Sequence, residues 1–135
     1  LGDTMQGNLD QLGAPEFSKE ENLYAKKYQD TLSRKDIESA YFHAGIDMVE
    51  GQVLAESVVS ADAKLVDMGG STDVADVSWI VPTVSLWGAN YAIGTPFHSW
   101  QMTAQGKSSI AIKGMTHAAM VMAATGSDLM TDKSF

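Results

Sequence analysis

A helix signal near the start of the chain constrains the fold more than any other feature. The stretch SKEENLYAKKYQDTL opens with Ser18 and carries Glu21 three residues later, which is the spacing of a capping box. Apolar side chains then recur at helical spacing and form one stripe: Leu23, Tyr24, Tyr28 and Leu32. The pattern predicts a helix over residues 19–32.

Helical spacing also marks the beginning of the chain, where apolar residues are three or four positions apart and precede Gly13 and Pro15: Leu1, Met5, Leu9 and Leu12. We expect a short amphipathic helix there. One further helical turn is expected just before Gly45.

The last helix is predicted in SSIAIKGMTHAAMVMAATG, where Ser108 can cap the start and Gly126 can close the end. The predicted buried side comprises Ile112, Met115, Ala119 and Met122. The opposite side would carry Lys113, Thr116, His117 and Met120. We expect this helix to pack across a sheet.

The sheet is predicted from VPTVSLWGANYAIGTP, which begins with β-branched residues and alternates in character between glycines. A strand is expected over residues 83–87. Residues 51–70 mix the two periodicities and support no assignment. Helices interleaved with a strand pattern predict an α/β or an α+β layer arrangement. Of the two we favour α/β, with helices packed on a mixed sheet.

The composition narrows the function. The 135 residues are the size of one domain and include no cysteine, so any metal must be held by His, Asp or Glu. The same absence is typical of a reducing compartment and predicts a cytoplasmic location. A net charge of -8 argues against nucleic acid as a partner, and no apolar run is long enough to cross a membrane. Because the first residue is leucine, we expect the chain to belong to something longer.

The first motif that could carry chemistry is GGSTDVADVSW. Paired glycines permit a tight turn, and Ser71, Thr72 and Asp73 are favoured at the entrance of a helix. One interpretation is a capped helix with Asp73 and Asp76 as acids of its first turn, and caps are commoner than binding sites. The other is an anion site, in which free backbone amides bind a carboxylate.

The second motif is GTPFHSWQ. Pro96 fixes the backbone just before His98, which lies between Phe97 and Trp100. An imidazole held in this way can ligate a divalent metal, while the alternative is a partly buried histidine satisfied by a backbone carbonyl.

The other histidines carry less signal. We expect His117 to face solvent, and His43 to be a loop or core residue. No group of His, Asp or Glu residues close together in the sequence has the spacing of a complete metal site. Tryptophans and methionines are predicted to be core or interface residues.

The motifs in order, GAPEF, GGSTDVADVSWIVPT, GTPFHSWQ and GKSSIAIKGM, resemble the C-terminal part of the zinc aminoacylase and glutamate carboxypeptidase superfamily. The resemblance covers nearly the whole chain and is weakest over residues 33–65. It implies that residues 1–15 are the exit from a lid (dimerisation) domain. Residues 16–135 would be the C-terminal part of a zinc-exopeptidase-like, metal-binding catalytic domain.

The resemblance also implies an activity, the hydrolysis of the amide bond of an acyl- or aminobenzoyl-glutamate. His98 would be one ligand of two divalent metal ions, zinc or manganese, which polarise the carbonyl and activate a water. Gly94 and Thr95 would lie in the pocket wall beside this ligand. The remaining pocket residues, around the substrate carboxylate, would be Gly70, Ser71, Thr72 and Asp73.

The family's His-x-Asp segment is absent from the chain, and the adjacent Glu20 and Glu21 belong to the start of the predicted helix over residues 19–32 rather than to the family's Glu-Glu pair, which contains the general base. We therefore expect the 135 residues alone to hydrolyse no such amide. The implied partners are a small acyl-amino-acid substrate, the N-terminal part of the same protein, and further copies or subunits in a homo- or hetero-oligomer.

The alternative is a non-catalytic binding or assembly module built on the same half of the fold. A segment of an enzyme is expected to expose a broad apolar face and to associate. An independent module is expected to be monomeric and to unfold cooperatively.

Overall fold

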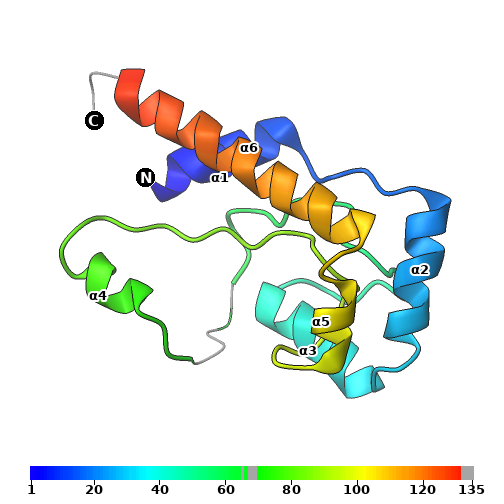
Figure 1. The fold of residues 1–135 in the computed structure, drawn as a ribbon. Helices are drawn as coiled ribbons and strands as arrows, with labels where there is room; N and C mark the ends of the chain where they lie inside the picture. The colour runs from blue at the N-terminus through cyan, green and yellow to red at the C-terminus, as the bar shows by residue number, and fades with distance from the viewer. Residues whose placement is uncertain (65, 67–69, 132–135) are drawn as a thin grey trace.

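The part of the chain that the structure describes consists of helices joined by irregular segments. The structure is a computed structural model and describes residues 1–64, 66 and 70–131. Figure 1 shows the helices in order: α1 (Gly2–Leu12), α2 (Lys19–Gln29), α3 (Arg34–Ala44), α4 (Val74–Ser78), α5 (Trp100–Gln105) and α6 (Ser109–Thr131). None of these six has the combination of length and apolar character that a membrane crossing requires.

The predicted α/β fold is wrong, because residues 1–64, 66 and 70–131 contain no strand. Residues 83–87, the expected strand, are irregular. Alternation of apolar and polar residues identifies a segment that can extend, but a strand exists only when a second extended segment supplies its hydrogen bonds. No such neighbour is present within the described residues, where helices and loops surround this stretch.

The helix predicted over residues 19–32 is confirmed as α2, although α2 ends at Gln29. Its capping box is complete, since the Glu21 backbone N–H donates to Ser18 Oγ (3.2 Å) and the Ser18 N–H donates to Glu21 Oε2 (2.7 Å). A second capping box, between Ser33 and Asp36, begins α3. The single turn expected before Gly45 is therefore a helix of 11 residues.

The N-terminal helix is confirmed as α1, and it packs along α6 in Figure 1. The Asn8 amide donates to Asp128 Oδ2 at 2.7 Å, and His117 Nε2 lies 2.6 Å from the carbonyl oxygen of Gly13. His117 is thus half-buried against the end of α1, and its predicted solvent-facing position is wrong. These contacts join the first and last helices of the chain.

The last helix begins where it was predicted, because Ser108 Oγ accepts from the Ala111 N–H at 3.1 Å. It does not end at Gly126 but continues to Thr131. The buried face was also wrongly predicted. The residues that the helix buries are Ile110, Gly114, Val121 and Thr125, whereas those expected to be buried are exposed: Ile112, Met115, Ala119 and Met122.

The reason for the different face is the close approach of α6 to a loop. A Cβ atom added at Gly114 would lie 2.5 Å from the carbonyl oxygen of Ala89 and would also clash with Asn90 Oδ1. Only glycine allows the helix axis to come this near. Apolar residues occur on both sides of α6, so periodicity does not distinguish the two faces.

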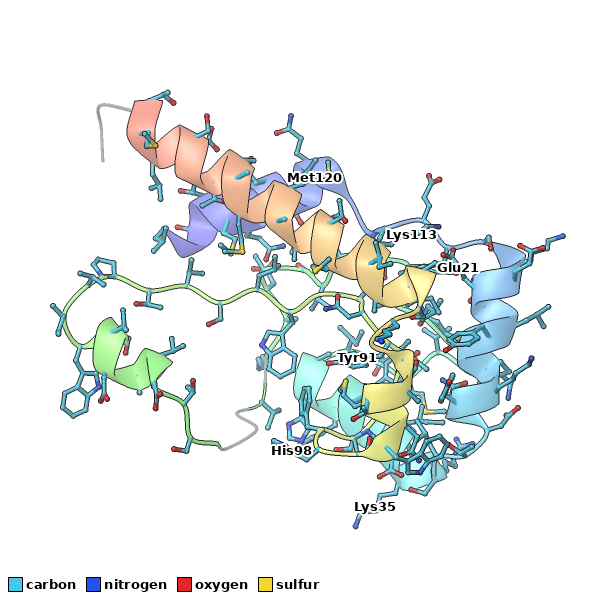
Figure 2. All side chains as sticks on the ribbon, viewed as in Figure 1. Glu21, Lys35, Tyr91, His98, Lys113 and Met120 are labelled. Atoms are coloured by element: carbon cyan, nitrogen blue, oxygen red, sulfur yellow. The ribbon has the colours of Figure 1, made fainter. Side chains whose placement is uncertain are left out.

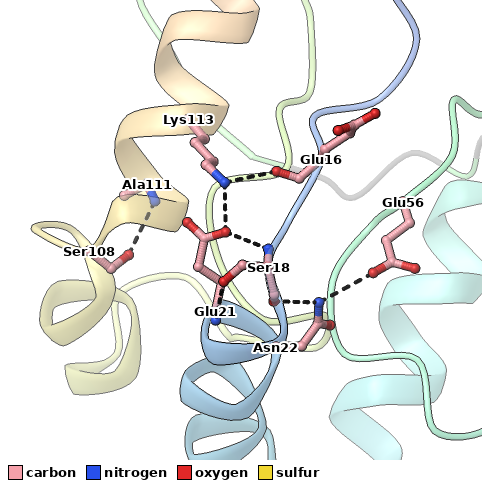
Figure 3. A network of polar contacts seen from close by, with 8 residues as sticks. All are labelled: Glu16, Ser18, Glu21, Asn22, Glu56, Ser108, Ala111 and Lys113. Carbon is pink, nitrogen blue, oxygen red and sulfur yellow. Dashed lines mark hydrogen bonds and ion pairs between the residues drawn. The ribbon is translucent and has the colours of Figure 1, made fainter.

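A small core and one ion pair hold α2 against α6. The core cluster comprises Ala25, Val53, Leu54, Ala92 and Ile110. Figure 3 shows Lys113 Nζ donating to Glu21 Oε2 (2.7 Å) and to the carbonyl oxygen of Glu16 (2.9 Å). Hydrogen bonds lower the pKa of Glu21 from 4.5 to about 2. The largest effect comes from Lys113, and the next largest from the Ser18 N–H. The Glu21 carboxylate therefore serves both as a helix cap and as an anchor for α6.

Candidate functional site

Most of the second motif lies in a loop of residues 88–99, which we call the anchored loop, while its last two residues, Trp100 and Gln101, begin α5. The buried Gln105 side chain of α5 holds this loop, since Gln105 Oε1 accepts from the Ala92 N–H (2.8 Å) and Gln105 Nε2 donates to Thr95 Oγ1 (3.1 Å). The Thr95 hydroxyl in turn donates to the Ala92 carbonyl at 2.7 Å. Every member of this buried network has a partner, which fixes the loop in one conformation.

Contacts from two other parts of the chain strengthen the anchor. The Ile93 N–H donates to the Val53 carbonyl at 2.8 Å, and the Gln29 amide donates to the Ile93 carbonyl at 3.4 Å. Gly94 has a φ of 90°, and a Cβ atom there would lie 2.9 Å from the Cα of Ile37. Both the backbone conformation and the space therefore require glycine at this position.

His98 is exposed at the turn that leads from the anchored loop into α5. Its φ of 58° is the only positive value among the non-glycine residues that the structure describes. The turn is fixed on both sides, because Ser99 Oγ donates to the Pro96 carbonyl (2.6 Å) and accepts from the Met102 N–H (3.2 Å). Figure 2 shows His98 near the edge of the molecule, below α6 in this view.

An exposed imidazole on a rigid turn does not fit the alternative of a partly buried histidine satisfied by a carbonyl. A left-handed conformation in a non-glycine residue is uncommon, and it recurs at functional sites. The role of His98 as a metal ligand stays a prediction. Gly94 and Thr95, the predicted pocket wall, lie buried in the same loop.

Three aromatic rings gather at the anchored loop and form what we call the aromatic cluster: Trp87, Tyr91 and Phe97. The Phe97 ring is central, with its centroid 5.7 Å from that of Trp87 and 6.1 Å from that of Tyr91. Trp87 is 65% exposed and Phe97 is 45% exposed, whereas burial raises the pKa of the Tyr91 phenol. Sequence reasoning missed this cluster. The available signal was the pair of aromatic residues Trp87 and Phe97, which directly precede Gly88 and directly follow Pro96.

The described part of the first motif, residues 70–79, lies in a different environment. Every residue from 70 to 83 is exposed, and we call this segment the arm. It contains α4, which stands apart from the other helices in Figure 1. Among the described residues, each hydrogen bond that the arm makes joins two residues of the arm. One example is the bond from the Val74 N–H to Thr72 Oγ1 (3.3 Å).

The predicted carboxylate-binding residues Gly70, Ser71, Thr72 and Asp73 all lie in the arm, before or at the start of α4. The Asp73 side chain makes no capping hydrogen bond to this five-residue helix. The described residues supply no hydrogen bond between these positions and the anchored loop. The structure thus groups Gly94, Thr95 and His98 but does not group the arm residues with them.

The ligand-type side chains among the described residues do not assemble into a metal site. No three His, Asp or Glu side chains in that part of the chain lie close enough together to hold an ion. His43 is half-buried near the end of α3, with Nδ1 3.4 Å from the Val66 carbonyl oxygen. An open hollow of about 410 Å³ between α2 and α3 includes none of the predicted site residues.

Comparison with known proteins adds one relative. The chain is 37% identical over 142 aligned residues to a subunit of the p-aminobenzoyl-glutamate hydrolase of Escherichia coli (strain K12). The expected resemblance to an enzyme that hydrolyses aminobenzoyl-glutamate is confirmed. The alignment includes 98% of this chain and 30% of the relative, so the chain spans less than a third of that protein's length. No family model matches the chain, and no solved structure matches it.

Proposed function

We propose that this chain takes part in the metal-dependent hydrolysis of the amide bond of an aminobenzoyl-glutamate or related acyl-glutamate. The observation that most strongly supports this proposal is the 37% identity to a p-aminobenzoyl-glutamate hydrolase subunit across 98% of the chain. In this proposal His98 is one ligand of two divalent metal ions, zinc or manganese. Gly94 and Thr95 form the wall beside it, and residues 70–73 bind the substrate carboxylate.

The anchored loop supports the role of His98. A ligand must be held in a fixed position, and functional residues are commonly carried on loops that a rigid scaffold positions. The buried Gln105 network and the bond from Ile93 to Val53 supply such a scaffold. Because the imidazole is exposed, it is free to contact a group that lies outside this chain.

The described residues by themselves do not fit a metal ion, because His98 has no second and third ligand nearby. A single imidazole holds a metal weakly, since stable sites use three or four protein ligands. In the proposal the other ligands and the general base come from protein outside these 135 residues. The chain alone is therefore expected to cleave no p-aminobenzoyl-glutamate.

A hybrid protein tests this proposal. The 135 residues replace the matching region of the E. coli protein, and release of p-aminobenzoate from p-aminobenzoyl-glutamate is measured with zinc or manganese. We expect activity that His98→Ala abolishes. Loss of a residue that merely orients a ligand costs roughly 10–100-fold, so loss of the ligand itself is expected to cost more than about 100-fold.

His43→Ala in the same hybrid is the control, because His43 is a half-buried histidine remote from the anchored loop in sequence. Its activity should stay within about twofold of the parent hybrid, as expected for a residue outside the reaction. Full activity of the His98→Ala hybrid, or hydrolysis by the 135 residues alone, would contradict the proposal.

The second candidate is a non-catalytic binding or assembly module, and the exposed arm is the observation that favours it. Trp79 is 89% exposed and Ile80 is 85% exposed, which are unusual values for large apolar side chains. Such an arm also suits an enzyme segment that contacts further protein, including the other subunits of an oligomer. An inactive hybrid, in an assay where the E. coli protein is active, would favour the module. The cytoplasmic location predicted from the lack of cysteine stays a prediction.

A further inference from the structure

We propose that the aromatic cluster of Trp87, Tyr91 and Phe97 binds the aryl ring of an aroyl-amino-acid substrate beside His98. The inference deepens the proposed function and rests on it. In this inference the three rings favour substrates with an aromatic acyl group over substrates with an aliphatic one. None of the three belongs to the pocket that the sequence motifs predicted.

The arrangement of the rings is the first argument. Phe97 meets Tyr91 edge-on with an interplanar angle of 82°, and it meets Trp87 at 58°. Aromatic rings attract one another at centroid separations of roughly 4.5–7 Å, in offset or edge-to-face geometries. An added aryl ring can join the cluster in the same way, through the parts of Trp87 and Phe97 that are exposed.

The position of the cluster is the second argument. His98 follows Phe97 directly, and Pro96 precedes it, so the ring and the imidazole share one rigid turn. Figure 2 shows the labelled Tyr91 and His98 in the same half of the molecule, on the side away from the C-terminal end of α6. A substrate ring at the cluster would therefore lie close to the residue that we propose as metal ligand.

The contrast with other exposed rings is the third argument. Trp79 is more exposed than Trp87, but it lies in the arm, whose hydrogen bonds to described residues are all internal. Trp87 directly precedes the anchored loop and Phe97 lies in it, and the Gln105 network holds this loop in place. Exposing large apolar rings on a rigid loop leaves their hydrophobic surface in water, which a ligand of matching chemistry would cover.

A direct binding measurement tests the inference without any metal or catalysis. The 135-residue chain is titrated with p-aminobenzoyl-glutamate and, separately, with N-acetyl-glutamate, which has the same glutamate but no ring. Nuclear magnetic resonance follows the indole N–H of each tryptophan and the ring protons of Phe97. We expect p-aminobenzoyl-glutamate to shift the Trp87 and Phe97 signals, and N-acetyl-glutamate to leave them unchanged.

Substitutions then locate the site. Trp87→Leu keeps an apolar side chain and removes the ring, so it should weaken binding of p-aminobenzoyl-glutamate by about five- to tenfold. Phe97→Leu should act in the same direction. Trp79→Leu is the matched control, an exposed tryptophan in the arm, and it should leave binding unchanged. Circular dichroism melting curves establish that each variant is folded.

Several results would overturn the inference. They are equal shifts from the two glutamates, no shift from p-aminobenzoyl-glutamate, or an equal loss of binding in Trp79→Leu and Trp87→Leu. If Trp87→Leu were to unfold, the Phe97→Leu chain and the shifts in the parent chain would decide the question.

Failure of the inference is distinguishable from failure of the proposed function. If the hybrid enzyme is active but Trp87→Leu lowers kcat/KM equally for aroyl- and acetyl-glutamate, the aryl site is wrong and the hydrolase stands. If the hybrid is inactive but the chain binds p-aminobenzoyl-glutamate at the cluster, the aryl site stands and the hydrolase is wrong.

Discussion

The arm contains most of the first motif and the anchored loop contains most of the second. The two segments nevertheless differ sharply in how they contact the rest of the protein. The anchored loop is tied to α2, α5 and residue 53 by hydrogen bonds, several of them buried. The arm is exposed along its whole length, and its hydrogen bonds to described residues remain inside it. Similar turn chemistry therefore yields a fixed site in one place and an unsupported segment in the other. What differs is the burial of the neighbouring polar groups.

The largest effect is expected where α6 meets the start of the anchored loop. Gly114→Ala would place a methyl group against Ala89 and Asn90, and should lower the free energy of unfolding by about 2–3 kcal/mol. Gly126→Ala on the same helix is the matched control. Nothing lies within 4 Å of its added Cβ, so helix propensity should raise stability by up to about 1 kcal/mol. Urea denaturation measures both, and equal effects would show that the close approach is absent.

The next effect concerns the buried network itself. Gln105→Leu keeps the size of the side chain but leaves the Ala92 N–H and the Thr95 hydroxyl without this partner. We expect a loss of about 2 kcal/mol, the cost of an unsatisfied buried donor. Gln101→Ala, one turn earlier in α5, removes only a surface hydrogen bond to Thr31 and should cost less than about 0.5 kcal/mol. Similar losses for both variants would contradict an anchored loop.

A smaller effect should follow from acidification. The pKa of Glu21 is lowered from 4.5 to about 2 in the folded chain, so below pH 4.5 the unfolded chain takes up a proton first. Stability should be unaffected by this group above pH 4.5 and should fall between pH 4.5 and about 2. Because the Lys113 side chain is 42% exposed, we expect a loss of only about 1–2 kcal/mol.

Two variants isolate this contribution. Glu21→Gln should flatten the fall in melting temperature between pH 4.5 and about 2. Glu16→Gln should not, since Lys113 contacts only the backbone carbonyl of Glu16. A parallel fall in the Glu21→Gln and parent chains would mean that other carboxylates govern the acid response.

The smallest change in stability is expected in the arm. The double substitution Trp79→Ser and Ile80→Ser replaces two highly exposed apolar side chains, and should alter the free energy of unfolding by less than about 0.5 kcal/mol. The same variant should associate less at high concentration in analytical ultracentrifugation, because exposed apolar surface drives association. Destabilisation by more than about 1 kcal/mol would show that the arm packs on the rest of the chain.

The sequence by itself determined the local features of this protein. The Ser18–Glu21 capping box, the helix in the first twelve residues and the cap of α6 at Ser108 were all predictable, because each depends on residues within one or two turns of one another. The two motifs also identified the resemblance that the comparison confirmed. Local hydrogen bonds and turn chemistry need no information about distant parts of the chain.

Only the tertiary structure decided which surfaces meet. It buried the face of α6 that contains Gly114, it left residues 83–87 without a strand partner, and it brought Trp87 and Phe97 together beside His98. The buried face of α6 depends on a segment far away in sequence, and a strand depends on a partner that periodicity does not identify. The contact between Trp87 and Phe97 depends on the path of the loop between them. An apolar residue every third or fourth position identifies a helix, but the choice of buried face follows from where the neighbouring backbone can approach most closely.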